Sequence, residues 1–156
     1  MEDLMKLFAM MVTVSVALLC WTGSAMAQTV TADRMIVPAA RAANFYDSMG
    51  GDRISGTWEP SAGQIQSLEG ALPNHLRSRS EAAGILRRGL AAYRVQYVGI
   101  IRNGQRVVYA NFFCRTHSTS WHQNPVVVDD GGDCYFQIEW NPTTNAFTRL
   151  MVNGEA

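Results

Sequence analysis

The sequence predicts an α+β fold in which one or two N-terminal helices pack on a four- to five-strand antiparallel meander that carries one disulfide. Three observations lead to this prediction. Apolar residues recur every three or four positions over 61–76 and then every second position from Tyr93 onward, a change from helical to strand periodicity. Asn103-Gly104, a dipeptide typical of two-residue hairpin turns, separates two alternating segments. Two cysteines, Cys114 and Cys134, remain beyond the leader.

Residues 1–27 have the pattern of a cleavable signal peptide. A short polar start is followed by an apolar run over 7–21, and small residues end in Ala25-Met26-Ala27, with cleavage expected before Gln28. A membrane anchor, which needs about 20 apolar residues, and lipid attachment at Cys20 are the alternatives. The run is closer in length to a signal core, and no small residue directly precedes Cys20. We therefore expect a periplasmic or secreted protein with no stable membrane insertion after signal removal.

The rest of the chain is short enough for one domain with a modest core. Residues 28–57 form an irregular pattern, because Gly50-Gly51 and Ser55-Gly56 interrupt the apolar positions. The sequence therefore predicts an N-terminal arm over 28–57 and a single helix-plus-antiparallel-sheet domain over 58–156. Around 53–58 we expect either loosely packed chain or a short strand.

The first predicted helix begins at Ser61, which forms an S-x-x-Q capping box with Gln64. Pro73 is expected to kink or end this helix near Leu72. A second short helix is predicted over 80–88. The first helix carries one apolar stripe, made of Ile65, Leu68, Leu72 and Leu76.

A hairpin follows the helices. If Asn103-Gly104 is its two-residue loop, Ile101 faces Arg106 and Val95 faces Phe112. One face of this hairpin is apolar and should be core; it carries Tyr93, Val95, Tyr97, Val108, Ala110, Phe112 and Cys114. Further strands are predicted over 126–128, 134–140 and 146–152.

Cys114 and Cys134 both project from apolar strand faces. In an oxidising compartment two remaining thiols are expected to pair. Closing a loop of about 20 residues is worth on the order of 3 kcal/mol in the chain-entropy picture. We expect a structural bridge.

Few residues suggest catalysis or metal binding. His117 and His122, with the two cysteines nearby, are the metal-ligand candidates, but their spacing matches no common zinc pattern and oxidised cysteines do not ligate. A tight turn accounts for the acidic run 129–133 better than a calcium site. No nucleophile elbow or phosphate-binding loop occurs. We expect no cofactor and no catalytic residue.

Charge is distributed unevenly. Eight arginines and a single acidic residue, Glu81, lie within 77–115, whereas the residues from Thr116 onward are mostly acidic. Neutralisation between the two halves is the favoured explanation; a basic surface for an anionic partner is the alternative. Because no aromatic residues alternate with the basic ones at nucleic-acid spacing, nucleic-acid binding is not expected.

The second hairpin face is half apolar. If the helices cover only the first face, this second face is an exposed surface of the kind that binds partners; alternatively, the N-terminal arm covers it as core. The sequence therefore favours a small exported, non-enzymatic module that binds a protein or an envelope polymer. A small hydrolase or metal-assisted enzyme using the loop histidines, and a structural subunit of an envelope complex, are the alternatives. The expected binding surface comprises Arg94, Gln96, Val98, Tyr109, Asn111 and Phe113.

Overall fold

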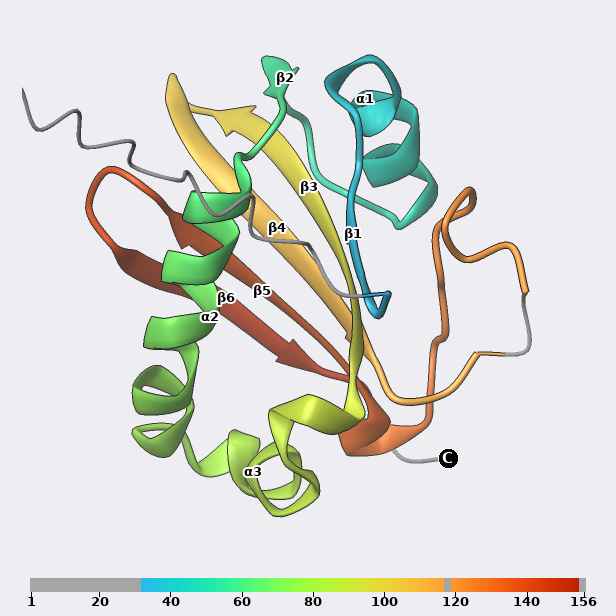
Figure 1. Ribbon diagram of the computed structural model, residues 1–156, viewed down its shortest axis with the longest axis vertical. Coiled ribbons are helices and arrows are strands. Elements are labelled where there is room, and N and C mark those ends of the chain that lie inside the picture. The colour runs from blue at the N-terminus through green and yellow to red at the C-terminus, as the bar shows by residue number, and fades with distance from the viewer. Residues whose placement is uncertain (1–31, 117–118, 155–156) are drawn as a thin grey trace, which may run out of the picture.

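A six-stranded mixed sheet carries the fold, with helices on both of its faces (Figure 1). The computed structural model describes residues 32–116 and 119–154. The predicted signal peptide therefore lies outside the described residues. Along the chain the elements are β1 (Arg34–Ile36), α1 (Ala39–Ser48), β2 (Gly56–Trp58), α2 (Ala62–Arg77), η1 (Ser80–Ala82), α3 (Ala83–Arg88), η2 (Leu90–Ala92), β3 (Arg94–Arg102), β4 (Gln105–Phe113), η3 (Gly132–Cys134), β5 (Tyr135–Asn141) and β6 (Ala146–Val152).

The sheet is larger than predicted and not wholly antiparallel. Strands β3, β4, β5 and β6 form a four-stranded antiparallel meander, and two short strands pair with the other edge of β3. β1 pairs in parallel, with Arg34 opposite Val95, and β2 pairs antiparallel, with Gly56 opposite Ile101. The α+β class is confirmed. The sequence did not predict β1, whereas β2 lies where a short strand was one of the two expectations; each strand has only three residues.

The β3–β4 hairpin has the predicted register. Val95 lies opposite Phe112 and Ile101 lies opposite Arg106. Asn103 and Gly104 have φ angles of 50° and 74°, and a type I′ turn requires positive φ at both positions. The turn residues therefore set which side chains share a face of the sheet.

Helix α2 begins with the predicted capping box: the Gln64 backbone N–H donates to Ser61 Oγ, and the Gln64 side chain accepts from the Ser61 N–H. The helix does not end near Leu72. Pro73 lies inside it, and the helix continues to Arg77. A proline inside a helix costs about 3 kcal/mol, and the complete burial of Leu76 in the following turn offsets this cost.

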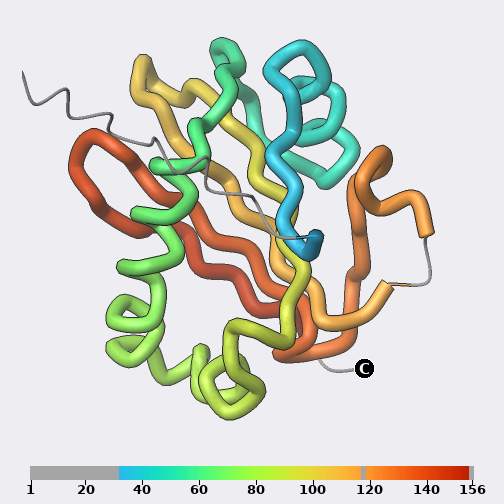
Figure 2. Tube along the Cα trace, viewed as in Figure 1, coloured from blue at the N-terminus to red at the C-terminus, as the bar shows by residue number. Residues whose placement is uncertain are grey.

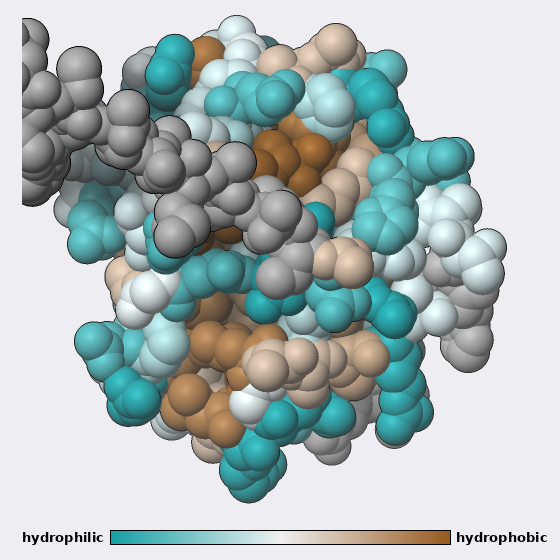
Figure 3. All heavy atoms as spheres, in the orientation of Figure 1, coloured by the Kyte–Doolittle hydropathy of each residue, from teal (hydrophilic) through white to brown (hydrophobic). Residues whose placement is uncertain are grey.

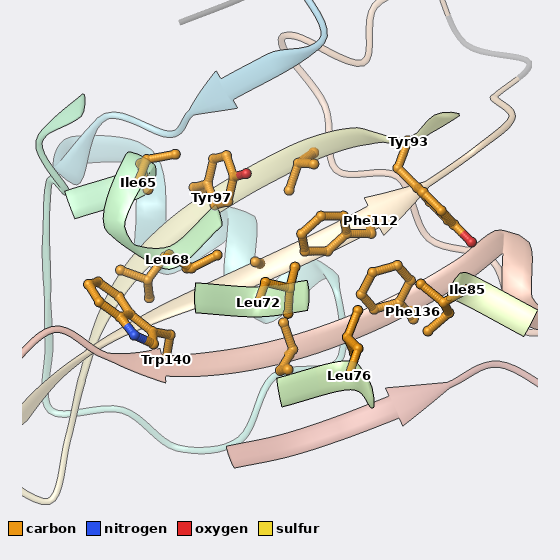
Figure 4. Close-up of a cluster of buried hydrophobic side chains, with 14 of the residues drawn as sticks. Ile65, Leu68, Leu72, Leu76, Ile85, Tyr93, Tyr97, Phe112, Phe136 and Trp140 are labelled. Carbon is orange, nitrogen blue, oxygen red and sulfur yellow. The ribbon is translucent and has the colours of Figure 1, made fainter. Parts of the chain in front are cut away.

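Helices α2 and α3 cover one face of the sheet and form the first core (Figure 4). The apolar stripe of α2 points at the rings of Tyr97, Phe112 and Phe136, and Ile85 of α3 closes the lower end. Phe112 and Phe136, from neighbouring strands, stack with their ring centroids 4.3 Å apart. This face is the predicted core face of the hairpin.

The other face of the sheet is a second core, so the predicted exposed binding surface is wrong. Val98 and Phe113 are completely buried, and Gln96, Tyr109 and Asn111 are buried with them; Arg94 alone of the six is exposed. Helix α1 lies on this face together with the loop after β4, as seen at the right of Figure 2. Their apolar residues are Ala42, Phe45, Tyr46 and Trp121. Part of the segment expected to be a loose arm is thus a helix that covers the sheet.

The predicted disulfide is present. Cys114 and Cys134 are bridged with an S–S distance of 1.99 Å and a Cα–Cα distance of 5.0 Å. The bridge joins the end of β4 to η3, just before β5. Within the described ranges, no helix is long and apolar enough to cross a membrane.

Candidate functional site

The polar residues of the expected binding surface bind the protein's own chain. Gln96 Nε2 donates to the carbonyls of Trp121 and Asn124 at 2.7 and 2.8 Å. Gln96 Oε1 accepts from the backbone N–H of Val126 and from Asn111 Nδ2, both at 3.1 Å. Every polar atom of this buried amide is therefore used to hold the loop after β4 on the sheet.

A row of amide side chains extends this arrangement across β4 and β5. Asn111 Nδ2 donates to the Val126 carbonyl at 2.8 Å, and Gln137 Nε2 donates to Asn111 Oδ1 at 3.2 Å. Asn153 Nδ2 then donates to the Val128 carbonyl. Residues 126–128, predicted as a strand, are thus held over the sheet by side chains and not by strand pairing. We call Gln96, Asn111 and Gln137 the amide row.

The histidine candidates do not form a metal site in the described structure. His117 lies outside the described residues. His122 is exposed, and its ring lies against that of Trp121 with the centroids 3.7 Å apart. Among residues 32–116 and 119–154, no group of three His, Cys, Asp or Glu side chains is arranged to hold a metal ion.

A buried carboxylate lies at the other end of the second core. Glu139, on β5, is only 3% exposed. Arg102 Nη1, from the end of β3, donates to both of its oxygens at 2.5 and 2.6 Å. Arg149 Nε, from β6, lies 3.8 Å from Glu139 Oε1. A buried carboxylate requires such compensation, because an unpaired buried charge is strongly destabilising.

The network continues into the segment after α1. Arg149 Nη1 lies 2.5 Å from Asp52 Oδ2, and Arg102 Nη2 lies 3.8 Å from the same oxygen. Arg102 Nη2 also donates to Tyr46 Oη on α1. Two carboxylates and two guanidinium groups therefore connect α1 and its following loop to three strands. We call Tyr46, Asp52, Arg102, Glu139 and Arg149 the charge network.

The backbone around the network is irregular. The register between β5 and β6 shifts between Gln137 and Glu139, and Arg149 has a φ of 54°. A left-handed conformation costs a residue with a Cβ roughly 1–2 kcal/mol. Bulges redirect side chains and are frequent beside functional sites. Here the irregularity accompanies the contact of Arg149 with both carboxylates.

Two tyrosines border the network. The rings of Tyr46 and Tyr109 meet edge to face, with the centroids 5.0 Å apart. Burial raises the pKa of the Tyr109 phenol, and the neighbouring Tyr46 and Glu139 raise it further. Burial also raises the pKa of Tyr46, although Arg102 opposes this shift. Both phenols are thus neutral hydrogen-bonding groups at physiological pH.

A cavity of about 430 Å³ opens beside the network, between the C-terminal half of α1 and the following loop. Its volume lies within the range of about 300–1,000 Å³ that is usual for small-molecule sites. Tyr46 and Asp52 belong to both the charge network and the cavity wall. The complete lining is Ala43, Asn44, Tyr46, Asp47, Gly51, Asp52, Arg53 and Ile54.

Asp47 occupies an unfavourable position in this wall. It lies in the last turn of α1, where no basic residue offsets its charge, and it takes part in no ion pair within the described part of the chain. An anionic side chain near a helix C-terminus is destabilising by about 0.3–1 kcal/mol, because it faces the negative end of the helix dipole. Residues that go against such local sequence preferences are found most often at functional positions.

Gly51 brings the cavity wall close to Tyr46. A Cβ atom at Gly51 would overlap the Tyr46 ring, so the loop backbone packs directly on that ring. The sequence showed the cluster Gly50-Gly51-Asp52 only as a break between elements. Its position after an amphipathic segment containing Phe45 and Tyr46 was the signal that could have indicated a helix end.

A second recess lies on the opposite side of the sheet, between α2 and η2, where Figure 3 shows apolar side chains at the surface. Leu72, Leu90 and Phe112 line it. Glu69 at its rim already accepts hydrogen bonds from Arg34 and from Tyr97 Oη, the latter at 2.6 Å. At about 210 Å³ it is smaller than the usual small-molecule site, and we therefore regard the cavity beside the charge network as the candidate site.

Comparisons of the chain with protein-family models, with characterised proteins and with solved structures find no match.

Proposed function

We propose that the chain is a small exported, non-enzymatic binding module of the bacterial periplasm or cell envelope, and that its ligand occupies the cavity beside α1. The observation that carries this proposal is a polar cavity of about 430 Å³ whose wall shares Tyr46 and Asp52 with a buried charge network. A site held by such supporting contacts is already organised before its ligand arrives, which reduces the entropic cost of binding.

The lining favours a hydroxyl-rich ligand without strong net charge. Asp47 and Asn44 supply acceptors, and Arg53 and the Asn44 amide supply donors. Asp52 is balanced by Arg149, so the cavity lacks the excess of cations that a phosphate or sulfate group would need. Ala43 and Ile54 are its few apolar lining residues, which disfavours an apolar ligand. A segment of an envelope glycan has the matching chemistry.

The two other functions expected from the sequence have less support. An enzyme using His117 and His122 stays a prediction, since His117 lies outside the described residues and His122 stacks on Trp121. A structural subunit of an envelope complex also stays a prediction. No observation in the described structure favours either of them over a binding module.

Chemical-shift mapping tests the proposal. The ¹⁵N-labelled chain without residues 1–27 is titrated with neutral N-acetylglucosamine oligomers. A sulfated oligosaccharide of similar length is the charged comparison. We expect the neutral probe to shift the backbone amides of Asn44, Asp47, Gly51 and Asp52, and the sulfated probe to leave them unchanged. Shifts confined to other surfaces, or no binding of the neutral probe, would contradict the proposed function.

A further inference from the structure

The end of the molecule opposite the candidate cavity carries a basic surface. It is formed by the last turn of α2, by η1 and by α3, at the bottom of Figure 1, whereas α1 lies at the top. Four residues define what we call the basic corner, all of them exposed: Arg77, Arg79, Leu86 and Arg87. Within 77–88 the single acidic residue is Glu81.

Internal pairing leaves part of this charge unbalanced. Arg88, next to the basic corner, forms an ion pair with Asp133, and Arg77 Nη1 donates to Asn74 Oδ1 at 2.6 Å. Arg79 and Arg87 form no ion pair with any residue in the described ranges. An acidic residue of the C-terminal half therefore neutralises Arg88, but none neutralises Arg79 or Arg87.

Leu86 is exposed next to Arg87 in the chain. Helix α3 buries Ile85 against the first core, whereas Leu86 is 37% exposed and is one of four large apolar side chains exposed in the described structure. Helix C-termini favour basic residues, which accounts for Arg87 and Arg88. Dipole effects give no reason for an apolar side chain at the same corner.

We propose that the basic corner docks the protein peripherally onto an anionic phospholipid surface, with the arginines at the phosphates and Leu86 inserted among the headgroups. Basic residues next to exposed apolar ones are the composition of interfacial membrane contacts. A soluble polyanion would engage the arginines but would leave Leu86 in water, so the leucine distinguishes the two partners. Docking in this orientation directs the cavity beside α1 away from the membrane. The inference is independent of the proposed ligand.

Co-sedimentation with vesicles tests this docking. The secreted chain is mixed with vesicles of phosphatidylcholine alone, or of phosphatidylcholine with phosphatidylglycerol, at low and high salt. We expect binding only to the anionic vesicles, and its loss at high salt through screening. The double variant Arg79→Ser with Arg87→Ser should bind about 25-fold more weakly, since each surface arginine contributes about fivefold. Leu86→Ser should also weaken binding.

The matched control removes two arginines from the other end of the molecule. Arg41→Ser with Arg106→Ser makes the same change in net charge, at two exposed positions, one on α1 and one at the β3–β4 hairpin, and should retain vesicle binding. Melting temperatures of all variants verify that they fold. The proposal would be overturned if the control variant lost as much vesicle binding as the double variant, or if the protein bound uncharged vesicles equally well. It would also be overturned if Leu86→Ser bound vesicles as tightly as the unmodified protein while the protein bound soluble polyphosphate tightly.

Discussion

Glu139 shows how one residue can connect the second core to the candidate site. Its carboxylate is 3% exposed and receives two hydrogen bonds from Arg102, which also contacts Tyr46 in the cavity wall. Glu139→Gln keeps the shape but removes the charge that balances Arg102. We expect it to lower the free energy of unfolding by about 3 kcal/mol, because the largely buried Arg102 guanidinium then keeps only the more distant carboxylate of Asp52, at 3.8 Å, to balance its charge. Urea denaturation measures this loss.

An apolar pair at the same positions is the control for this prediction. Arg102→Met combined with Glu139→Leu removes both charges, and such replacements of buried ion pairs are often neutral or stabilising. We expect the double variant to be more stable than Glu139→Gln alone but to lose the fixed position of Tyr46. If Glu139→Gln and the unmodified protein were equally stable, the Arg102–Glu139 ion pair would not contribute to the stability of the fold.

Tyr97 makes the stability of the folded protein decrease as the pH rises above 10. Burial raises the pKa of its phenol well above 10.0, and the nearby Glu69, which accepts its O–H at 2.6 Å, raises it further. Below pH 10 the phenol is neutral in both the folded and the unfolded chain, so this contribution to stability is complete. Above pH 10 the unfolded chain loses the proton while the folded protein keeps it, and stability falls.

Tyr97→Phe should therefore be less stable than the unmodified protein at pH 8, by about 1.5–3 kcal/mol for a hydrogen bond to a charged group, yet should lose less stability between pH 9 and pH 11. Urea denaturation across this pH range measures both effects. Tyr135→Phe, in a half-buried tyrosine, is the comparison. Identical pH dependence in all three proteins would be evidence against the role assigned to Tyr97.

At the level of the elements, the amide row holds residues 126–128 over the sheet in place of strand pairing. Asn111 bonds to Gln96, Gln137 and the Val126 carbonyl. Asn111→Leu has a similar shape but removes the hydrogen bond to the Val126 carbonyl and one of the two partners of Gln96 Oε1 and of Gln137 Nε2; a buried polar group left unsatisfied costs about 1–3 kcal/mol. We expect faster hydrogen exchange of the Val126 amide and lower stability. Thr148→Leu, at an exposed position of the same sheet, should leave this exchange rate unchanged.

Local signals were enough to predict some elements. The Ser61–Gln64 capping box marked the start of α2, and Asn103-Gly104 determined the register of β3 and β4. Both depend on a few adjacent residues, which the sequence displays directly. Of the two effects expected of Pro73, a kink or an end near Leu72, the end does not occur, because the burial of Leu76 against the sheet outweighs the local penalty of Pro73.

Other elements depend on partners far along the chain. β1 and β2 have three residues each, and both need β3 to pair with. Helix α1 begins at Ala39, and its N-cap, Pro38, makes no side-chain cap hydrogen bond, so its start lacks the capping signal that marks α2. Without α1, the sequence left open whether the second face of the hairpin is exposed or covered. The candidate site was missed for the same reason, because its wall is formed by α1 and the loop that follows it.

For the whole molecule, the disulfide joins the end of β4 to the segment just before β5, beside the first core. Cys114 packs against the first core, and Tyr93 Oη donates to the Asp133 carbonyl beside Cys134. The double variant Cys114→Ser with Cys134→Ser should lose about 3 kcal/mol of stability, since the unfolded chain is no longer restricted. Calorimetry of the oxidised and reduced protein, with the variant, measures this loss. If reduction lowered the melting temperature of the variant as well, the effect would not come from the bridge.

The central claim is that the cavity beside α1 binds a ligand, and Asp47→Ala tests it most directly. Removing Asp47 should increase stability by about 0.3–1 kcal/mol, because the charge opposes the dipole of α1. The same change should weaken binding of the neutral glycan probe by about tenfold or more, because it removes a charged hydrogen-bond acceptor. Asp129→Ala, in an exposed turn, should change neither. Calorimetric titration and thermal melting of the three proteins decide the matter: higher stability with weaker binding in Asp47→Ala supports the account, and unchanged affinity in that variant contradicts it.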